Sequence, residues 1–113
     1  MPMNSYRTPG RSGLVVSPLA FGTMTFGSGA WGADEVSSRA IFDHYLNAGG
    51  NIIDTADIYS GGESEKLVSK FIADSGSRNA IVLATKFAFN DAASPVKTQT
   101  GGGNPNAGFA ACE

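Results

Sequence analysis

Apolar side chains recur every three or four positions in two segments of the chain, and this spacing predicts two amphipathic helices. The first helix is expected to begin at Asp34, a good N-cap residue, and to end at Gly49–Gly50. The second is expected over 63–75, with Gly76 at its C-terminal end. The apolar positions of the first helix are Val36, Ala40, Ile41, Tyr45, Leu46 and Ala48. Those of the second helix are Leu67, Val68, Phe71 and Ile72.

Three short apolar runs alternate with these helices and predict β-strands over 19–21, 51–54 and 80–85. A turn-rich segment over 5–17 precedes the first strand and predicts a β-hairpin. Strands that alternate with helices in this way form parallel sheets covered by helices. The predicted fold class is therefore α/β: an N-terminal hairpin followed by three parallel strands and two helices.

The ends of the three strands repeat at a constant interval, because Gly22, Asp54 and Lys86 stand 32 residues apart. A barrel of eight strand–helix units in about 250 residues has about 31 residues per unit. A doubly wound sheet has similar intervals, so the spacing leaves both architectures open. If adjacent strands align on this repeat, Asp54 and Lys86 are direct neighbours in the sheet.

Residues 91–113 differ in composition from residues 1–90, which carry all the predicted elements. The last segment is rich in glycine, asparagine and proline and has neither helical nor strand periodicity, which predicts a loop or a disordered tail. Three parallel strands cannot close a barrel by themselves. We therefore interpret residues 1–90 as the N-terminal part of a larger domain and the tail as the result of a truncation or a change of reading frame.

Charge and composition exclude several classes of function. The 113 residues have a formal net charge of −2, and the eight basic residues are scattered, which argues against nucleic-acid binding and against a polybasic membrane patch. No apolar run is long enough to span a bilayer. One cysteine, Cys112, and one histidine, His44, argue against a structural metal site, and a single cysteine fits a cytoplasmic location. Nothing in the sequence indicates the oligomeric state.

Active sites of both candidate architectures lie at the carboxyl ends of the parallel strands, where this chain places Asp54, Lys86 and the following-loop residue Tyr59. An ammonium group beside a phenol favours the phenolate and lowers the pKa of a tyrosine from its usual value near 10. With Asp54 holding Lys86, Tyr59 is then suited to protonate a carbonyl oxygen as hydride reaches the carbon. The same residues also allow a purely structural Asp–Lys pair beside a packed tyrosine.

Four segments of the chain carry a resemblance to a known family: Phe21–Met24, Gly49–Tyr59, Gly61–Glu65 and Leu83–Lys86. In this order and spacing they resemble the aldo/keto reductase family, most closely its bacterial aryl-alcohol-dehydrogenase-like branch. The hairpin is similar to the cap at the bottom of that family's barrel. The resemblance implies a (β/α)8 TIM barrel, NADPH as cofactor, and reversible reduction of aldehydes or ketones to alcohols.

The resemblance also implies roles for single residues. Three of the family's four catalytic positions are matched by Asp54, Tyr59 and Lys86. The positions beside the nicotinamide are matched by Gly22, Thr23, Met24 and Asp54. The fourth catalytic position is a histidine on the next strand, which this sequence lacks, and His44 is expected to be a solvated helix residue. Phe26 and Trp31 either wall the pocket of a small carbonyl substrate or cover the barrel rim.

We expect the 113-residue chain alone to be inactive as a reductase, because the histidine and the remaining cofactor site are missing from it. Two other functions remain open from the sequence. One is a non-catalytic member of the same family that binds NADPH and acts as a partner subunit. The other is a small flavodoxin-like binding domain, complete in itself.

Overall fold

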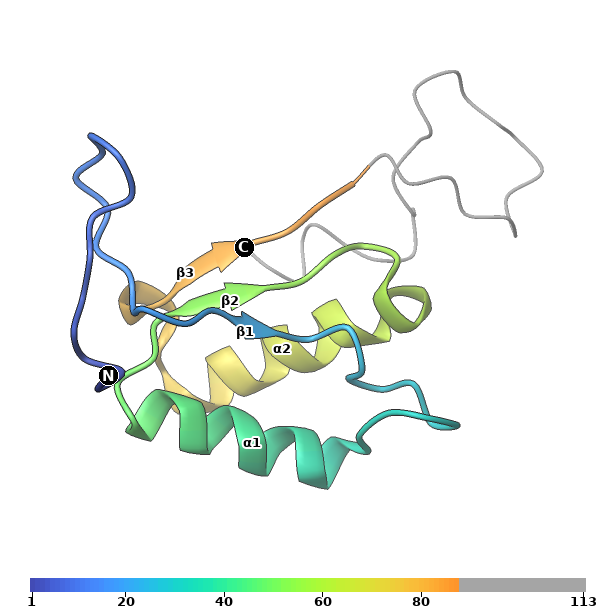
Figure 1. Ribbon diagram of the computed structural model, residues 1–113. Coiled ribbons are helices and arrows are strands. Elements are labelled where there is room, and N and C mark those ends of the chain that lie inside the picture. Colours follow the sequence, from blue (N-terminus) through green and yellow to red (C-terminus); the bar gives the residue numbers. More distant parts are fainter. Residues whose placement is uncertain (88–113) are drawn as a thin grey trace, which may run out of the picture.

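The computed structural model describes residues 1–87, which form a three-stranded sheet with two helices packed on it (Figure 1). The strands are β1 (Phe21–Gly22), β2 (Ile52–Asp54) and β3 (Val82–Ala84), and the helices are α1 (Glu35–Asn47) and α2 (Glu63–Ser75). Two 3₁₀ turns, η1 (Tyr59–Gly62) and η2 (Arg78–Ala80), precede α2 and β3. The predicted order of elements is confirmed, and the predicted tail over 91–113 lies outside the described residues.

The strand order is β1-β2-β3, and both pairs of neighbours are parallel. Both helices lie on the same side of the sheet in Figure 1. A flavodoxin-like sheet places its second strand outside the first and has helices on both faces. Sequential strands with helices on one side are the arrangement of a β/α barrel. The flavodoxin-like alternative is therefore wrong for this chain.

The register of the sheet follows the 32-residue repeat at the first pair of strands only. Gly22 lies opposite Asp54, but Asp54 lies opposite Ala84 rather than Lys86. The expected direct alignment of Asp54 with Lys86 is thus wrong by two residues. Because side chains alternate between the two faces of a strand, a shift of two keeps both residues on the same face.

Helix α1 begins where the sequence predicts but buries a different face. Asp34 Oδ1 accepts a hydrogen bond of 2.7 Å from the Ser37 N–H, and this backbone bond lowers the pKa of Asp34. The predicted apolar face is wrong in part, since Val36 and Ile41 are exposed. The helix turns a neighbouring row toward the sheet, and its buried residues are Ser38, Phe42 and Tyr45.

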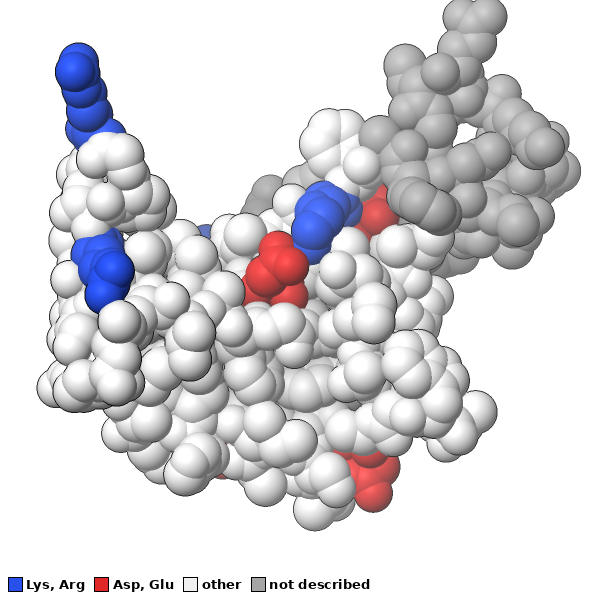
Figure 2. Space-filling view, in the orientation of Figure 1, with Lys and Arg blue, Asp and Glu red and all other residues white. Residues whose placement is uncertain are grey.

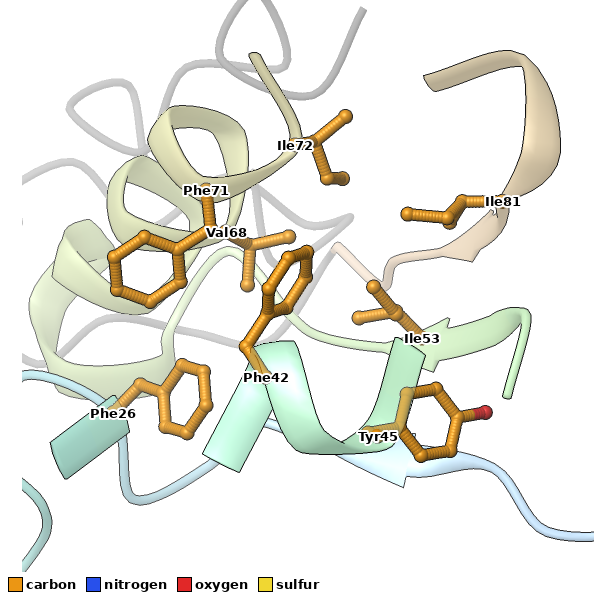
Figure 3. Packing of buried hydrophobic residues seen from close by; sticks show 8 residues of the cluster. All are labelled: Phe26, Phe42, Tyr45, Ile53, Val68, Phe71, Ile72 and Ile81. Atoms are coloured by element: carbon orange, nitrogen blue, oxygen red, sulfur yellow. The ribbon is translucent and has the colours of Figure 1, made fainter. Parts of the chain in front are cut away.

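Helix α2 confirms its predicted face, with Val68, Phe71 and Ile72 buried, and it ends at Gly76 in the left-handed conformation (φ 63°). Figure 3 shows how both helices and the sheet contribute to one core. Its buried members are Phe26, Phe42, Tyr45, Ile53, Val68, Phe71, Ile72 and Ile81. This packing fixes α2 against the side of the sheet opposite to Asp54.

The remaining segments differ from their predicted lengths. The hairpin is held by one antiparallel bridge, in which Arg7 and Val16 exchange backbone hydrogen bonds of 2.8 and 2.9 Å. The third strand is shorter than expected, because Ala80 belongs to η2. Within residues 1–87, no helix combines the length and apolar character needed to cross a bilayer.

Candidate active site

Two rows of side chains alternate where the three strands end. Asp54 and Lys86 project on the side of the sheet away from the helices, where their side-chain atoms meet. The residues after Gly22, Asp54 and Ala84 are all threonines, and they project toward the helices. Thr23 and Thr55 are fully buried there. At this edge of the sheet, the side away from the helices thus carries charged groups, and the side facing the helices carries threonine hydroxyls.

The Lys86 ammonium group is the centre of the charged side. Its Nζ donates to Asp54 Oδ1 at 2.9 Å and to the carbonyl oxygen of Thr55 at 2.8 Å, and it lies 3.4 Å from Tyr59 Oη. An ammonium group has three protons, so these three partners use all of them. Asp54, Lys86 and Tyr59 therefore meet as the sequence predicts, although the register differs.

The Asp54–Lys86 pair is half-exposed rather than buried. The Lys86 and Asp54 side chains keep 52% and 40% of their accessible surface. Figure 2 shows acidic and basic side chains meeting on a face that is otherwise mostly uncharged. Desolvation lowers the pKa of Lys86, but its hydrogen bonds to Asp54 and Tyr59 outweigh this effect, so the pKa of Lys86 is raised. The lysine is therefore firmly cationic at neutral pH.

Tyr59 reaches Lys86 because the chain reverses immediately after it. Ser60, Gly61 and Gly62 have φ values of 52°, 63° and 100°, all in the left-handed region. Glycine at two of these three positions removes most of the steric cost of such a turn. The turn is tied back by a 3.3 Å hydrogen bond from the Tyr59 N–H to the carbonyl of Ala56. Helix α2 then starts directly from the turn at Glu63.

A pocket of about 580 Å³ opens beside the Tyr59 side chain. It is lined by Met24, Ala56, Asp57, Ile58, Tyr59, Lys86 and Phe87. Met24 and Phe87 offer large exposed apolar surfaces at its rim. A mostly apolar concavity with a few converging polar groups is the usual form of a small-molecule site.

The predicted cofactor-contacting residues divide between the two faces of the sheet. Above Gly22 there is open space, since an added Cβ would meet no atom within 4 Å. Met24 lines the pocket and Asp54 lies on the same side as Gly22. Thr23 is fully buried, and its hydroxyl is bonded to Ser64 Oγ at 2.9 Å on the helix side. Gly22, Met24 and Asp54 thus fit an approaching planar ring, whereas the Thr23 side chain does not face it.

Both loop aromatics lie away from the pocket. Phe26 is 2% exposed and packs edge-on against Phe21 and Phe71, so the pocket-wall interpretation is wrong for this residue. Trp31 is 67% exposed and does not line the pocket. His44 is exposed on α1, as predicted. Among residues 1–87, no group of three or more acidic, histidine or cysteine side chains is placed to hold a metal ion.

Sequence reasoning missed the residues behind the strand ends. Ser64 and Glu65, in the first turn of α2, are 0% and 1% exposed despite their polar side chains. They contact Thr23, Thr55 and Thr85. The signal that was available is a threonine next to each expected strand end: Thr23 follows Gly22, Thr55 follows Asp54 and Thr85 precedes Lys86.

Sequential parallel strands, helices on one side and a polar site at the carboxyl strand ends define this part of the chain as the beginning of a TIM barrel with a candidate active site in its usual place. The aldo/keto reductase family model matches residues 18–106, and the chain belongs to this family.

Individual relatives cover the same region. The chain is 42% identical over 80 residues to norsolorinic acid reductase of Aspergillus flavus, a match that covers 67% of this chain and 21% of that protein. It is 38% identical over 80 residues to aryl-alcohol dehydrogenase [NADP(+)] of Phanerodontia chrysosporium, which covers 66% of this chain and 21% of that one.

Among solved structures, the holo form of aldo-keto reductase AKR11C1 from Bacillus halodurans matches with a TM-score of 0.60 and 42% identity. This match covers 71% of the present chain and 24% of the Bacillus chain. The chain therefore spans about a fifth to a quarter of the length of these relatives.

Proposed function

We propose that this chain supplies the proton-donating half of a reductase site that converts aldehydes or ketones to alcohols. The observation that carries the proposal is the meeting of Asp54 and Tyr59 at Lys86, beside a pocket that Tyr59 and Lys86 line. Tyr59 is the general acid, Lys86 stabilises the phenolate that Tyr59 becomes, and Asp54 orients Lys86. Norsolorinic acid reductase and aryl-alcohol dehydrogenase, which this chain resembles, carry names for the same class of chemistry.

The hydrogen-bond directions at the site explain how Tyr59 acts. Lys86 donates to Tyr59 Oη, and an ammonium group cannot accept a hydrogen bond in return. The phenolic proton is therefore available to a substrate oxygen in the pocket. When that proton moves to the carbonyl oxygen, the phenolate left behind is stabilised by the cation 3.4 Å away. Asp54 balances the lysine charge, so that the ammonium group stays in place throughout.

The cofactor we propose is NADPH, which when bound would supply the hydride that reaches the carbonyl carbon. The open face above Gly22 and the exposed side chain of Met24 would lie against the nicotinamide, with Asp54 beside it. Thr23 would contribute through its backbone alone, because its hydroxyl is bonded to Ser64. The preference for NADPH rests on the relative whose name specifies NADP(+).

The role of Tyr59 is tested in a complete barrel, made by replacing the matching segment of the Bacillus halodurans reductase with residues 18–87 of this chain. In this graft, Tyr59→Phe is expected to lower kcat for an aromatic aldehyde by at least 100-fold, the scale of general acid catalysis. NADPH binding, measured by fluorescence quenching, should stay within twofold. Retained turnover in the Tyr59→Phe graft would remove Tyr59 from its role.

The cofactor contact is tested by Gly22→Ala. No atom lies within 4 Å of the added methyl group, so the fold should be unaffected and thermal unfolding should be unchanged. NADPH binding by the graft should nevertheless weaken at least tenfold, because the methyl group occupies the face where the ring would lie. Unchanged NADPH affinity would show that the cofactor does not approach Gly22.

The 113 residues alone are expected to show no appreciable NADPH-dependent turnover, since they span about a fifth of the relatives' length. Robust reduction of an aromatic aldehyde by the isolated chain would contradict this. A graft that binds NADPH tightly but reduces no carbonyl compound would support the alternative of a non-catalytic partner subunit.

A cytoplasmic location remains a prediction from the single cysteine.

A further inference from the structure

The first turn of α2 contacts all three threonines behind the strand ends. Ser64 Oγ donates to the carbonyl oxygen of Thr23 at 2.6 Å and lies 3.5 Å from Thr55 Oγ1. Thr85 Oγ1 donates a short hydrogen bond to Glu65 Oε1. Because α2 is packed into the core through Val68 and its neighbours, this turn is a rigid support for the ends of the strands.

Glu65 is an unexpected choice for a buried position. It is 1% exposed, and its Oε2 has no hydrogen-bond partner among the described residues. Burial raises the pKa of Glu65, and the charge of Asp57 acts in the same direction, while the hydrogen bond from Thr85 opposes the shift. An apolar side chain would fill this space without that cost. The hydrogen bond to Thr85 is therefore the specific contact that the carboxyl group provides.

Thr85 stands immediately before Lys86, at a point where β3 has ended. Residues 1–87 contain no strand on the outer side of β3, and within them the end of β3 is held by β2 and α2. On the β2 side, the Asp57 N–H donates to the carbonyl oxygen of Lys86 at 3.1 Å. On the α2 side, the hydrogen bond from Thr85 to Glu65 fixes the preceding residue. These two contacts together set the direction in which the Lys86 side chain leaves the backbone.

We propose that Glu65 is a positioning residue for Lys86. By holding the Thr85 hydroxyl, it keeps the end of β3 in the orientation that places Lys86 Nζ between Asp54 and Tyr59. Glu65 and Thr85 lie behind the sheet and do not line the pocket. The geometric part of the proposal stands by itself, and its catalytic consequence rests on the proposed function.

The geometric part is tested on the 113-residue chain labelled with ¹⁵N-lysine. Ammonium protons held by three hydrogen bonds exchange slowly with water, so Lys86 should give a distinct ¹H–¹⁵Nζ signal, assigned by its loss in Lys86→Gln. In Thr85→Val, which keeps the shape of the side chain but removes the hydroxyl, exchange should accelerate at least tenfold. Thr85→Ser restores the hydroxyl and should restore slow exchange.

Changes at position 65 should follow the same logic. Glu65→Gln keeps an oxygen that can accept from Thr85 and should leave the Lys86 signal intact, whereas Glu65→Leu should lose it. The matched control is Glu63→Gln, on the exposed side of the same turn, which should have no effect. Val68→Ala destabilises α2 without touching the hydrogen bond, so slow exchange should persist in it while the chain remains folded.

Each result decides the question. Equal signals in Thr85→Val and the unchanged chain would overturn the proposal, as would a loss of signal in Thr85→Ser or in a Val68→Ala chain that circular dichroism shows to be folded. A wild-type chain without any protected Lys86 signal would overturn it too, since the anchored lysine is its premise. If Glu65→Leu unfolds, the comparison of Thr85→Val with Thr85→Ser still decides the outcome.

The catalytic consequence is measured separately in the grafted reductase. Thr85→Val should lower kcat between about 10- and 100-fold, the scale expected for a small misplacement of a catalytic group, with KM unchanged. Thr85→Ser should recover kcat. A graft that is inactive even before mutation would contradict the proposed function but leave the lysine exchange result standing. An active graft with unaltered kcat in Thr85→Val would contradict the positioning role alone.

Discussion

Removing one buried hydroxyl should measurably destabilise the sheet that carries the site. Tyr45 is 9% exposed, and its Oη accepts from the Ile52 N–H at 3.1 Å and lies 2.9 and 2.8 Å from the carbonyl oxygens of Leu19 and Ile52. It thereby joins α1 to the segment before β1 and to the start of β2. Tyr45→Phe keeps the ring, which stacks on Phe21 at 4.9 Å, so the substitution creates no cavity.

The cost of Tyr45→Phe follows from the groups that lose their partner. The phenol has one proton, so it satisfies one of the two carbonyl groups at a time, and it also accepts the hydrogen bond from Ile52. A buried donor or acceptor left without a partner costs about 1–3 kcal/mol. We therefore expect the free energy of unfolding to fall by about 2 kcal/mol.

The assay for Tyr45→Phe is urea unfolding of the 113-residue chain followed by circular dichroism, with amide exchange at Ile52 as a local measurement. The matched control is Tyr6→Phe, because the Tyr6 hydroxyl also bonds a backbone carbonyl, that of Gly49 at 2.9 Å, but the residue is 47% exposed. Water replaces that bond, so the control should change stability by less than about 0.5 kcal/mol. Equal effects of the two substitutions, or unchanged exchange at Ile52, would refute the reasoning.

Two further predictions concern packing and pH. Gly50→Ala should lower the free energy of unfolding by about 2–3 kcal/mol, because the added Cβ would overlap the Tyr45 ring, whose hydroxyl is held in place. Thermal unfolding measures this change, and an unchanged stability would contradict the close packing. Because the pKa of Glu65 is raised in the folded state, its contribution to stability grows as the pH falls through that pKa toward the ordinary value of 4.5. Glu65→Gln should lack this dependence. The free energy of unfolding of Glu65→Gln should therefore exceed that of the unchanged chain most at neutral pH, and the excess should shrink toward pH 5. Urea unfolding of both chains measures this, and the same difference at every pH would disprove it.

Local patterns in the sequence were sufficient for the elements and for their order. The N-cap at Asp34, the stop at Gly76 and the buried face of α2 depend on residues close together in the chain, and the structure confirms all three. The meeting of Asp54 with Lys86 was also predictable, because alternation along a strand survives a register shift of two residues.

Features that depend on contacts between distant segments could not be predicted. The face that α1 buries is decided by its packing against Phe71 and the sheet. From the sequence alone, Val36 and Ile41 were equally suitable for burial, but both are exposed. Phe26 was expected at the pocket wall or at the barrel rim because it lies in a strand–helix loop, but it is buried in the core. In both cases the side chain packs against Phe71, which is distant in the sequence from Phe42 and from Phe26.

The sequence by itself determined the alternation of strands and helices and the chemistry available at the strand ends. Only the tertiary structure decided that Thr23 turns away from the site, that the ion pair remains half-exposed, and that Glu65 is buried behind Lys86. The physical reason is that periodicity specifies which face of an element a residue occupies, whereas burial and hydrogen bonding depend on what the rest of the chain packs against that face.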